Sequence, residues 1–173
     1  MHVIHLLQTL NQTQMKKILL FLAITVTVST TKSFSQDAQQ QSQLSQLLTQ
    51  YYTIKDALVA GNGTNASASA EQYIKTLNTI DYKVISEGNV NALLKDATSI
   101  SETKDIKKQR DQFANLSTNM AVLAKAVKLS SQPIYQVYCP MKKANWLSNE
   151  QTIKNPYYGS AMLTCGKVVE TIQ

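Results

Sequence analysis

The hydrophobic pattern of this chain changes at Pro133, and this change limits the folds that the chain can adopt. Before Pro133, apolar residues recur at steps of three and four, as they do along one face of an α-helix. After Pro133, short β-branched and aromatic runs are typical of strands. Proline cannot continue the hydrogen-bond ladder of a helix, and it restricts the residue before it. We therefore expect helices up to this point and strands after it.

Four segments carry the helical pattern, and their apolar faces run over residues 44–58, 66–80, 90–97 and 106–127. We expect Gly61-Asn62-Gly63 to end the first helix, since glycine adopts the left-handed conformation that closes helices. Thr64 or Asn65 would cap the second helix. Four amphipathic helices with short connections favour an antiparallel bundle. The predicted fold is mainly α: an antiparallel bundle of about four helices with a small, loop-rich C-terminal element that resembles a β-hairpin.

The start of the chain has the three-part layout of a secretory signal peptide. Met15-Lys16-Lys17 is a basic opening, residues 18–28 are apolar or threonine, and small polar residues follow up to Ser35-Gln36. The apolar run is too short to span a bilayer, which takes about 20 residues. We predict a signal peptide over residues 15–35, cleaved near Ser35-Gln36, and export to the periplasm. An uncleaved signal that anchors the protein in the membrane is the alternative.

The rest of the chain divides around this signal peptide. Residues 1–14 are expected to be an upstream extension, and residues 36–173 a single domain with a Cys/Met motif within residues 133–173. Residues 36–45, rich in Gln and Ser, are expected to fray. Three of the 17 basic residues and none of the 11 acidic residues precede residue 36, so the domain has a net charge of +3 (14 minus 11). That balance, without mixed basic and aromatic segments, argues against nucleic-acid binding.

Two segments after Pro133 have the pattern of strands, residues 134–138 and residues 167–172. If they pair antiparallel, Cys139 leaves the end of the first strand where Cys165 enters the second. The pairing would then bring both thiols within a few ångström of each other. The prediction of a functional site depends on this convergence.

The two cysteines of the chain each have a methionine nearby, in Cys139-Pro140-Met141 and in Met162-Leu163-Thr164-Cys165. Thiolates and thioethers are soft donors that favour Cu(I), and by extension Ag(I), over hard cations. A metal site would therefore use Cys139 and Cys165, with Met141 and Met162 as supporting ligands. The alternative is a Cys139–Cys165 disulfide, worth about 3.5 kcal/mol in the chain-entropy model, with both methionines filling gaps in a small core. Export permits such a disulfide to form and persist.

Aromatic residues accompany both cysteines. Tyr138 precedes the first cysteine, and Trp146, Tyr157 and Tyr158 lie between the two. We expect these four side chains to line a pocket at the cysteines and to exclude water from it. Recognition of a cation by the same rings is the alternative role.

Several kinds of catalytic site are excluded by composition. The only histidines are His2 and His5, so the exported part holds no Ser-His-Asp or Cys-His catalytic site and no histidine-containing zinc site. It also has no glycine-rich phosphate loop and no Cys-x-x-Cys motif. We therefore predict that the protein is not an enzyme. A thiol redox protein that uses one exposed cysteine is a third hypothesis.

The C-terminal segment contains four motifs: Tyr138-Cys139-Pro140-Met141, Trp146-Leu147-Ser148, residues 153–159 and residues 162–166. Together they resemble the C-terminal signature of domain-of-unknown-function family 3347, and residues 51–58 resemble its opening. The resemblance implies an exported bacterial protein, as in many Bacteroidetes. Some members of this family are fused to periplasmic adaptor subunits of copper/silver efflux systems, so the resemblance also implies metal handling.

The string Tyr138-Cys139-Pro140-Met141 is also similar to a heavy-metal-binding motif of metal exporters, in which histidine and proline follow the methionine. Lys142 and Lys143 follow it in this chain, which removes one candidate ligand. We expect a periplasmic domain that binds Cu(I) or Ag(I) in metal efflux or tolerance, with an efflux adaptor or another periplasmic protein as its partner. The alternative is a non-catalytic periplasmic interaction domain whose two cysteines form a structural disulfide.

Overall fold

The computed structural model describes residues 37–173, and the compact unit within it extends from Gln40 to Gln173. The expected upstream extension, the signal peptide and its cleavage point lie outside the described residues. Within residues 37–173, no helix is both long enough and apolar enough to cross a membrane.

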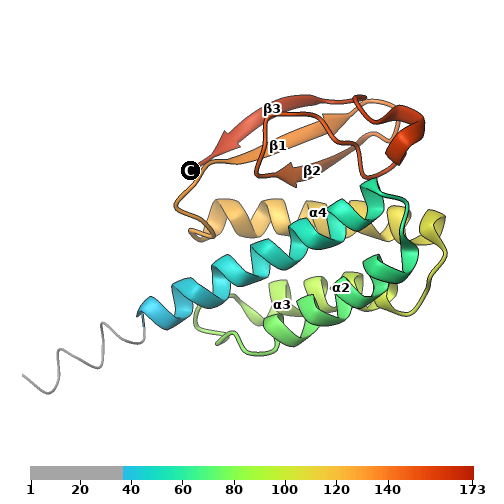
Figure 1. Cartoon of the computed structure of the whole chain (residues 1–173). Helices are drawn as coiled ribbons and strands as arrows, with labels where there is room; N and C mark the ends of the chain where they lie inside the picture. The colour runs from blue at the N-terminus through green and yellow to red at the C-terminus, as the bar shows by residue number, and fades with distance from the viewer. Residues whose placement is uncertain (1–36) are drawn as a thin grey trace, which may run out of the picture. The chain divides into compact units, whose positions relative to one another are not determined.

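Four helices make up most of the described fold, as the sequence predicts. The first spans residues 37–59, and α2 (Gly63–Leu77), α3 (Glu87–Ser101) and α4 (Ile106–Ala126) follow it. Short connections make consecutive helices antiparallel, as Figure 1 shows. Helix α3 packs on both α2 and α4. Their apolar faces form one core, in which Tyr51, Tyr73 and Phe113 are completely buried.

Side-chain caps set the start of two of these helices. Asn62 accepts the backbone N–H of Asn65 at 2.9 Å, so α2 begins directly after Asn62. The prediction that Thr64 or Asn65 caps this helix is therefore wrong, because both residues lie inside it. Asp105 caps α4 in the same way by accepting backbone N–H groups of its first turn. Such a cap satisfies N–H groups that have no partner within the helix.

The first helix begins earlier than the sequence predicts. Residues 37–45 are helical, although their Gln- and Ser-rich composition predicts a frayed leader. The side-chain amide of Gln41 donates to the carbonyl oxygen of Lys128 at 3.0 Å, and the hydroxyl of Ser45 donates to that of Leu129 at 3.1 Å. These contacts with the segment after α4 order a stretch that has few apolar side chains.

Three strands follow the helices: β1 (Ile134–Cys139), β2 (Ala144–Ser148) and β3 (Lys167–Ile172). They form an antiparallel sheet in the order β2-β1-β3, with β1 in the middle. The predicted pairing of the first and last of these strands is confirmed. The sheet contains one strand more than the expected hairpin-like element, since residues 144–148 also pair with β1. A short 3₁₀ helix, η1 (Gly159–Met162), comes between β2 and β3 along the chain.

The sheet lies over the first helix and α4, on the side of the bundle opposite α2 and α3 (Figure 1). Tyr51 of the first helix contacts both α4 and β2. Its hydroxyl accepts the backbone N–H of Leu147 at 3.0 Å and is hydrogen-bonded to the hydroxyl of Ser117 at 2.7 Å. Its ring stacks on Phe113 with the ring centroids 5.1 Å apart. These contacts fix the position of the sheet, and with it the position of both cysteines.

Candidate dithiol site

The two cysteines meet at one end of the sheet. Cys139 is the last residue of β1, and Cys165 comes shortly before the start of β3. Because the two strands pair antiparallel, with Tyr138 opposite Lys167, both cysteines lie at the same end of the sheet. Their Sγ atoms are 4.0 Å apart, and both thiols are free. Cys139 is completely buried, whereas Cys165 is partly exposed.

Two N–H groups point at the sulfur of Cys139. The backbone N–H of Lys142 donates to it at 3.4 Å, and the side-chain amide of Asn155 donates to it at 3.3 Å. The first donor belongs to the turn between β1 and β2, where Lys143 has a positive φ of 55°. The second belongs to the loop before η1. Hydrogen bonds to a candidate ligand atom fix its orientation, so the direction of the Cys139 sulfur is set by both segments.

The environment of Cys165 favours its neutral thiol. Desolvation raises the pKa of this thiol above its usual value, and the neighbouring Cys139 raises the pKa further. The nearby backbone N–H of Met141 lowers the pKa and opposes part of this effect. A cation bound between the sulfurs would reverse the balance, because a coordinated thiol loses its proton.

Asn155 is completely buried and connects the two cysteines. Its side-chain amide donates both to Cys139 Sγ and, at 2.7 Å, to the carbonyl oxygen of Cys165. This residue is missing from the site predicted from the sequence. The Asn155-Pro156 dipeptide indicates a turn, but no local signal indicates contacts with cysteines 16 and 10 residues away. We define Cys139, Cys165 and Asn155 together as the dithiol site.

The four aromatic residues predicted to line a pocket at the cysteines occupy unequal positions. Trp146 and Tyr157 are buried, and their rings meet edge to face with the centroids 5.9 Å apart. Burial raises the pKa of Tyr157, and the nearby Cys139 also raises it. Tyr138 is half-buried in β1, next to Cys139, and Tyr158 is half-buried against the core.

A glycine is required directly after Cys165. Gly166 has a φ of 153°, a backbone conformation that favours glycine. A Cβ atom at this position would lie 2.7 Å from Cη2 of Trp146 and 3.3 Å from Cγ2 of Ile153. The indole of Trp146 therefore packs directly on the backbone beside Cys165.

Met141 and Met162 lie at the surface, 59% and 37% exposed. The alternative that they fill gaps in the core is therefore wrong. The backbone carbonyl oxygen of Met162 accepts the N–H of Cys165 at 3.0 Å. Among the residues that the structure describes, no three or more His, Cys, Asp or Glu side chains gather where they could hold a metal ion.

The separation of the two sulfurs decides what the pair can do. A disulfide has its sulfurs about 2.05 Å apart, so the thiols would have to approach each other by about 2 Å. At the zinc–sulfur distance of about 2.3 Å, two thiolates on one ion lie about 3.8 Å apart at the tetrahedral angle and about 4.6 Å apart in a linear arrangement. The observed 4.0 Å lies within that range. The observed spacing of the two sulfurs is therefore compatible with two thiolates that share one ion.

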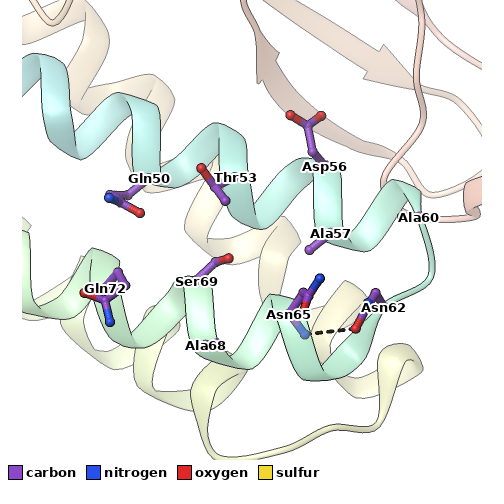
Figure 2. A pocket seen from close by; sticks show the side chains of 10 residues that line it. All are labelled: Gln50, Thr53, Asp56, Ala57, Ala60, Asn62, Asn65, Ala68, Ser69 and Gln72. Carbon is purple, nitrogen blue, oxygen red and sulfur yellow. Dashed lines mark hydrogen bonds between the residues drawn. The ribbon is translucent and has the colours of Figure 1, made fainter.

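Two cavities lie elsewhere in the described fold. An open groove of about 470 Å³ runs between the first helix and α2, as Figure 2 shows. Amides, hydroxyls, methyl groups and one carboxylate line it: Gln50, Thr53, Asp56, Ala57, Ala60, Asn62, Asn65, Ala68, Ser69 and Gln72. A smaller cavity of about 180 Å³ lies between α4 and the sheet. Neither shares a lining residue with the dithiol site.

Comparison with known proteins identifies the helical part of the chain. No curated protein and no solved structure gives a significant match. A family described as "Protein of unknown function (DUF3347)" matches residues 47–132, from within the first helix to just before Pro133. The C-terminal motifs, which carry most of the resemblance seen in the sequence, lie beyond the matched residues. Through the helices formed by residues 47–132, the chain belongs to the DUF3347 family of proteins of unknown function.

Proposed function

We propose that this protein is an exported, periplasmic and non-catalytic domain that binds Cu(I) or Ag(I) through Cys139 and Cys165. The single observation that supports this proposal best is the 4.0 Å separation of two free sulfurs. It matches two thiolates that share one ion, and it is about twice the sulfur–sulfur distance of a disulfide.

The chemistry of the donors selects the metal. Thiolates bind soft cations such as Cu(I) in preference to the hard cations that bind oxygen. The thioethers of Met141 and Met162 are soft donors of the same kind, and they lie on the turns that adjoin Cys165. Because both methionine side chains are exposed, they can turn toward an ion held by the thiols and complete its coordination.

The predicted signal peptide and the C-terminal motifs are the grounds for the proposed location and role in the cell. The layout of residues 15–35 predicts export, and the resemblance of the C-terminal motifs to domains fused to efflux adaptors suggests a role in copper or silver efflux or tolerance. The partner would be such an adaptor or another periplasmic protein that gives up or receives the ion.

A second function is favoured by the same strand geometry. Cys139 and Cys165 flank a paired strand end, where a disulfide would tie the 25 residues between them to the sheet. The protein would then be a periplasmic interaction domain with a structural disulfide. In this case metal binding would be absent from the oxidised protein.

Titration of Cu(I) separates the two functions. The protein is recovered from its own compartment, its free thiols are counted, and Cu(I) is added to the reduced form from a coloured chelator complex under nitrogen. We expect two free thiols, one Cu(I) per chain, and loss of binding in the Cys139→Ser/Cys165→Ser double variant. No free thiols, no copper taken up after reduction, and a large fall in melting temperature on reduction would support the disulfide instead.

A further inference from the structure

The buried side chain of Asn155 forms hydrogen bonds at the dithiol site through both its amide nitrogen and its carbonyl oxygen. Its amide nitrogen donates to Cys139 Sγ at 3.3 Å and to the carbonyl oxygen of Cys165 at 2.7 Å. Its Oδ1 accepts the backbone N–H of Tyr157 at 2.8 Å. An asparagine side chain has two N–H donors and one carbonyl acceptor, and each finds a partner here.

The backbone of Asn155 adds two further hydrogen bonds. Its N–H donates to the carbonyl oxygen of Leu163 at 2.8 Å, and its carbonyl oxygen accepts the N–H of Gly159 at 3.0 Å. One residue thus ties the end of β1, the loop before η1 and the turn that carries Cys165. No strand or helix holds that turn, since Cys165 lies between η1 and β3.

We propose that Asn155 is a positioning residue that holds the two cysteines as a preformed pair of sulfur ligands. It orients the sulfur of Cys139 directly and holds Cys165 through its carbonyl oxygen. The part of this inference that concerns metal affinity rests on the proposed function. The part that concerns the spacing of the two thiols does not.

The chemistry of the side chain explains why asparagine is required. An aspartate of the same shape would lack both donors and would bring its negative charge to a sulfur and a carbonyl oxygen. An alanine would leave the Cys165 carbonyl oxygen and the Tyr157 N–H without their partners in the interior. Loss of a residue that orients a metal ligand costs about 10- to 100-fold in metal affinity.

The test compares Asn155→Asp and Asn155→Ala with the matched control Asn119→Ala. Asn119 of α4 also donates a side-chain hydrogen bond, to Asp96 of α3 at 2.7 Å, but it does not contact either cysteine. Two quantities are measured for each protein. The first is the Cu(I) dissociation constant, and the second is the equilibrium between the dithiol and the disulfide in a glutathione buffer. In that equilibrium, both thiols give their two electrons and two protons to glutathione disulfide.

We expect both Asn155 variants to bind Cu(I) about 10- to 100-fold more weakly than the wild type. We also expect their thiols to pair about tenfold less readily, which is a rise of ~30 mV in reduction potential. Asn119→Ala should change neither quantity. Asn155 variants that match the wild type in both measurements would overturn the inference.

Failure of the proposed function gives a different result. If the wild type binds no Cu(I) but its reduction potential still rises in the Asn155 variants, the metal proposal is wrong and the positioning role stands. If the variants do not fold, hydrogen exchange in the reduced wild type provides the test. The side-chain amide protons of Asn155 should exchange at least about tenfold more slowly than those of exposed Asn149. Equal exchange rates would overturn the inference.

Discussion

The hydroxyl of Tyr51 accepts the backbone N–H of Leu147 at 3.0 Å, and this bond joins the first helix to β2. Residues 96 positions apart are thereby held together inside the core. The sheet that carries Cys139 depends on the bundle through this contact and through the Ser117 hydroxyl, which is 2.7 Å from the same oxygen.

Removal of this hydroxyl should destabilise the whole fold. Tyr51→Phe leaves the Leu147 N–H and the Ser117 hydroxyl without a partner in the interior, at a cost of about 1–3 kcal/mol. Unfolding in urea measures the change. Tyr82→Phe, at a side chain that is 62% exposed, serves as the control and should change the free energy of unfolding by less than about 0.5 kcal/mol. Equal effects of the two substitutions would show that the Tyr51 hydroxyl does not stabilise the fold.

Substitution of Gly166 should destabilise the fold. Gly166→Ala forces a side chain into a φ of 153° and places its Cβ 2.7 Å from Trp146, so we expect a loss of at least about 1 kcal/mol. Gly88→Ala is the control, because Gly88 lies in α3 with open space around it. That change should stabilise the protein by about 0.5–1 kcal/mol. Thermal unfolding of both variants checks the prediction, which fails if Gly166→Ala is neutral.

The carboxyl group of Asp96 should make stability depend on pH. Desolvation raises its pKa in the folded state, and the hydrogen bond from Asn119 only partly opposes this. The folded protein therefore holds this proton more tightly than the unfolded chain does. Its contribution to stability is present below the unfolded-state pKa of about 3.9 and is lost as the pH rises through the folded-state value.

Asp96→Asn removes this loss of stability. We expect the substitution to raise the free energy of unfolding at pH 7 and to have little effect at pH 3, as measured in urea at both values. Glu71→Gln, which neutralises an exposed carboxylate on α2, is the control and should have little effect at either pH. A loss of stability in Asp96→Asn at pH 7 would contradict the prediction.

The two thiols should differ in their reaction with iodoacetamide. Cys165 is partly exposed and Cys139 is completely buried, so Cys165 should be alkylated first. Its alkylation rate should rise with pH as the thiol loses its proton. Because its pKa is raised, the midpoint of this rise should lie above about pH 8.5, the pKa of a free cysteine. In Cys139→Ser the midpoint should fall, since Cys139 contributes to the shift. Peptide mapping by mass spectrometry from pH 6 to pH 10 measures this, and alkylation of Cys139 before Cys165 would contradict it.

Periodicity predicted the helices because each buries one continuous apolar face. It missed the start of the first helix, where Gln41 and Ser45 are held by hydrogen bonds to residues after α4 rather than by apolar contacts. It also missed β2, since Trp146, Leu147 and Ser148 are buried in succession and show no alternation. This segment is a strand because it pairs with β1. Such pairing with another segment leaves no pattern in the sequence of the strand itself.

The candidate site, like the fold, could be predicted from the sequence only in part. Two strand-like segments place Cys139 and Cys165 together by antiparallel pairing alone, and the structure confirms that they meet. The role of Asn155 was not predictable, because its partners lie 10 and 16 residues away and are reached only when the loop before η1 folds back. The exposure of the two methionines likewise depends on how the turns pack.

Because the two sulfurs are unequally buried, they are not equally accessible from solution. A reagent that arrives from solution therefore contacts Cys165 before it can contact Cys139. If the proposed function is right, an incoming ion would bind first to the outer sulfur, of Cys165, and then to the inner sulfur, of Cys139.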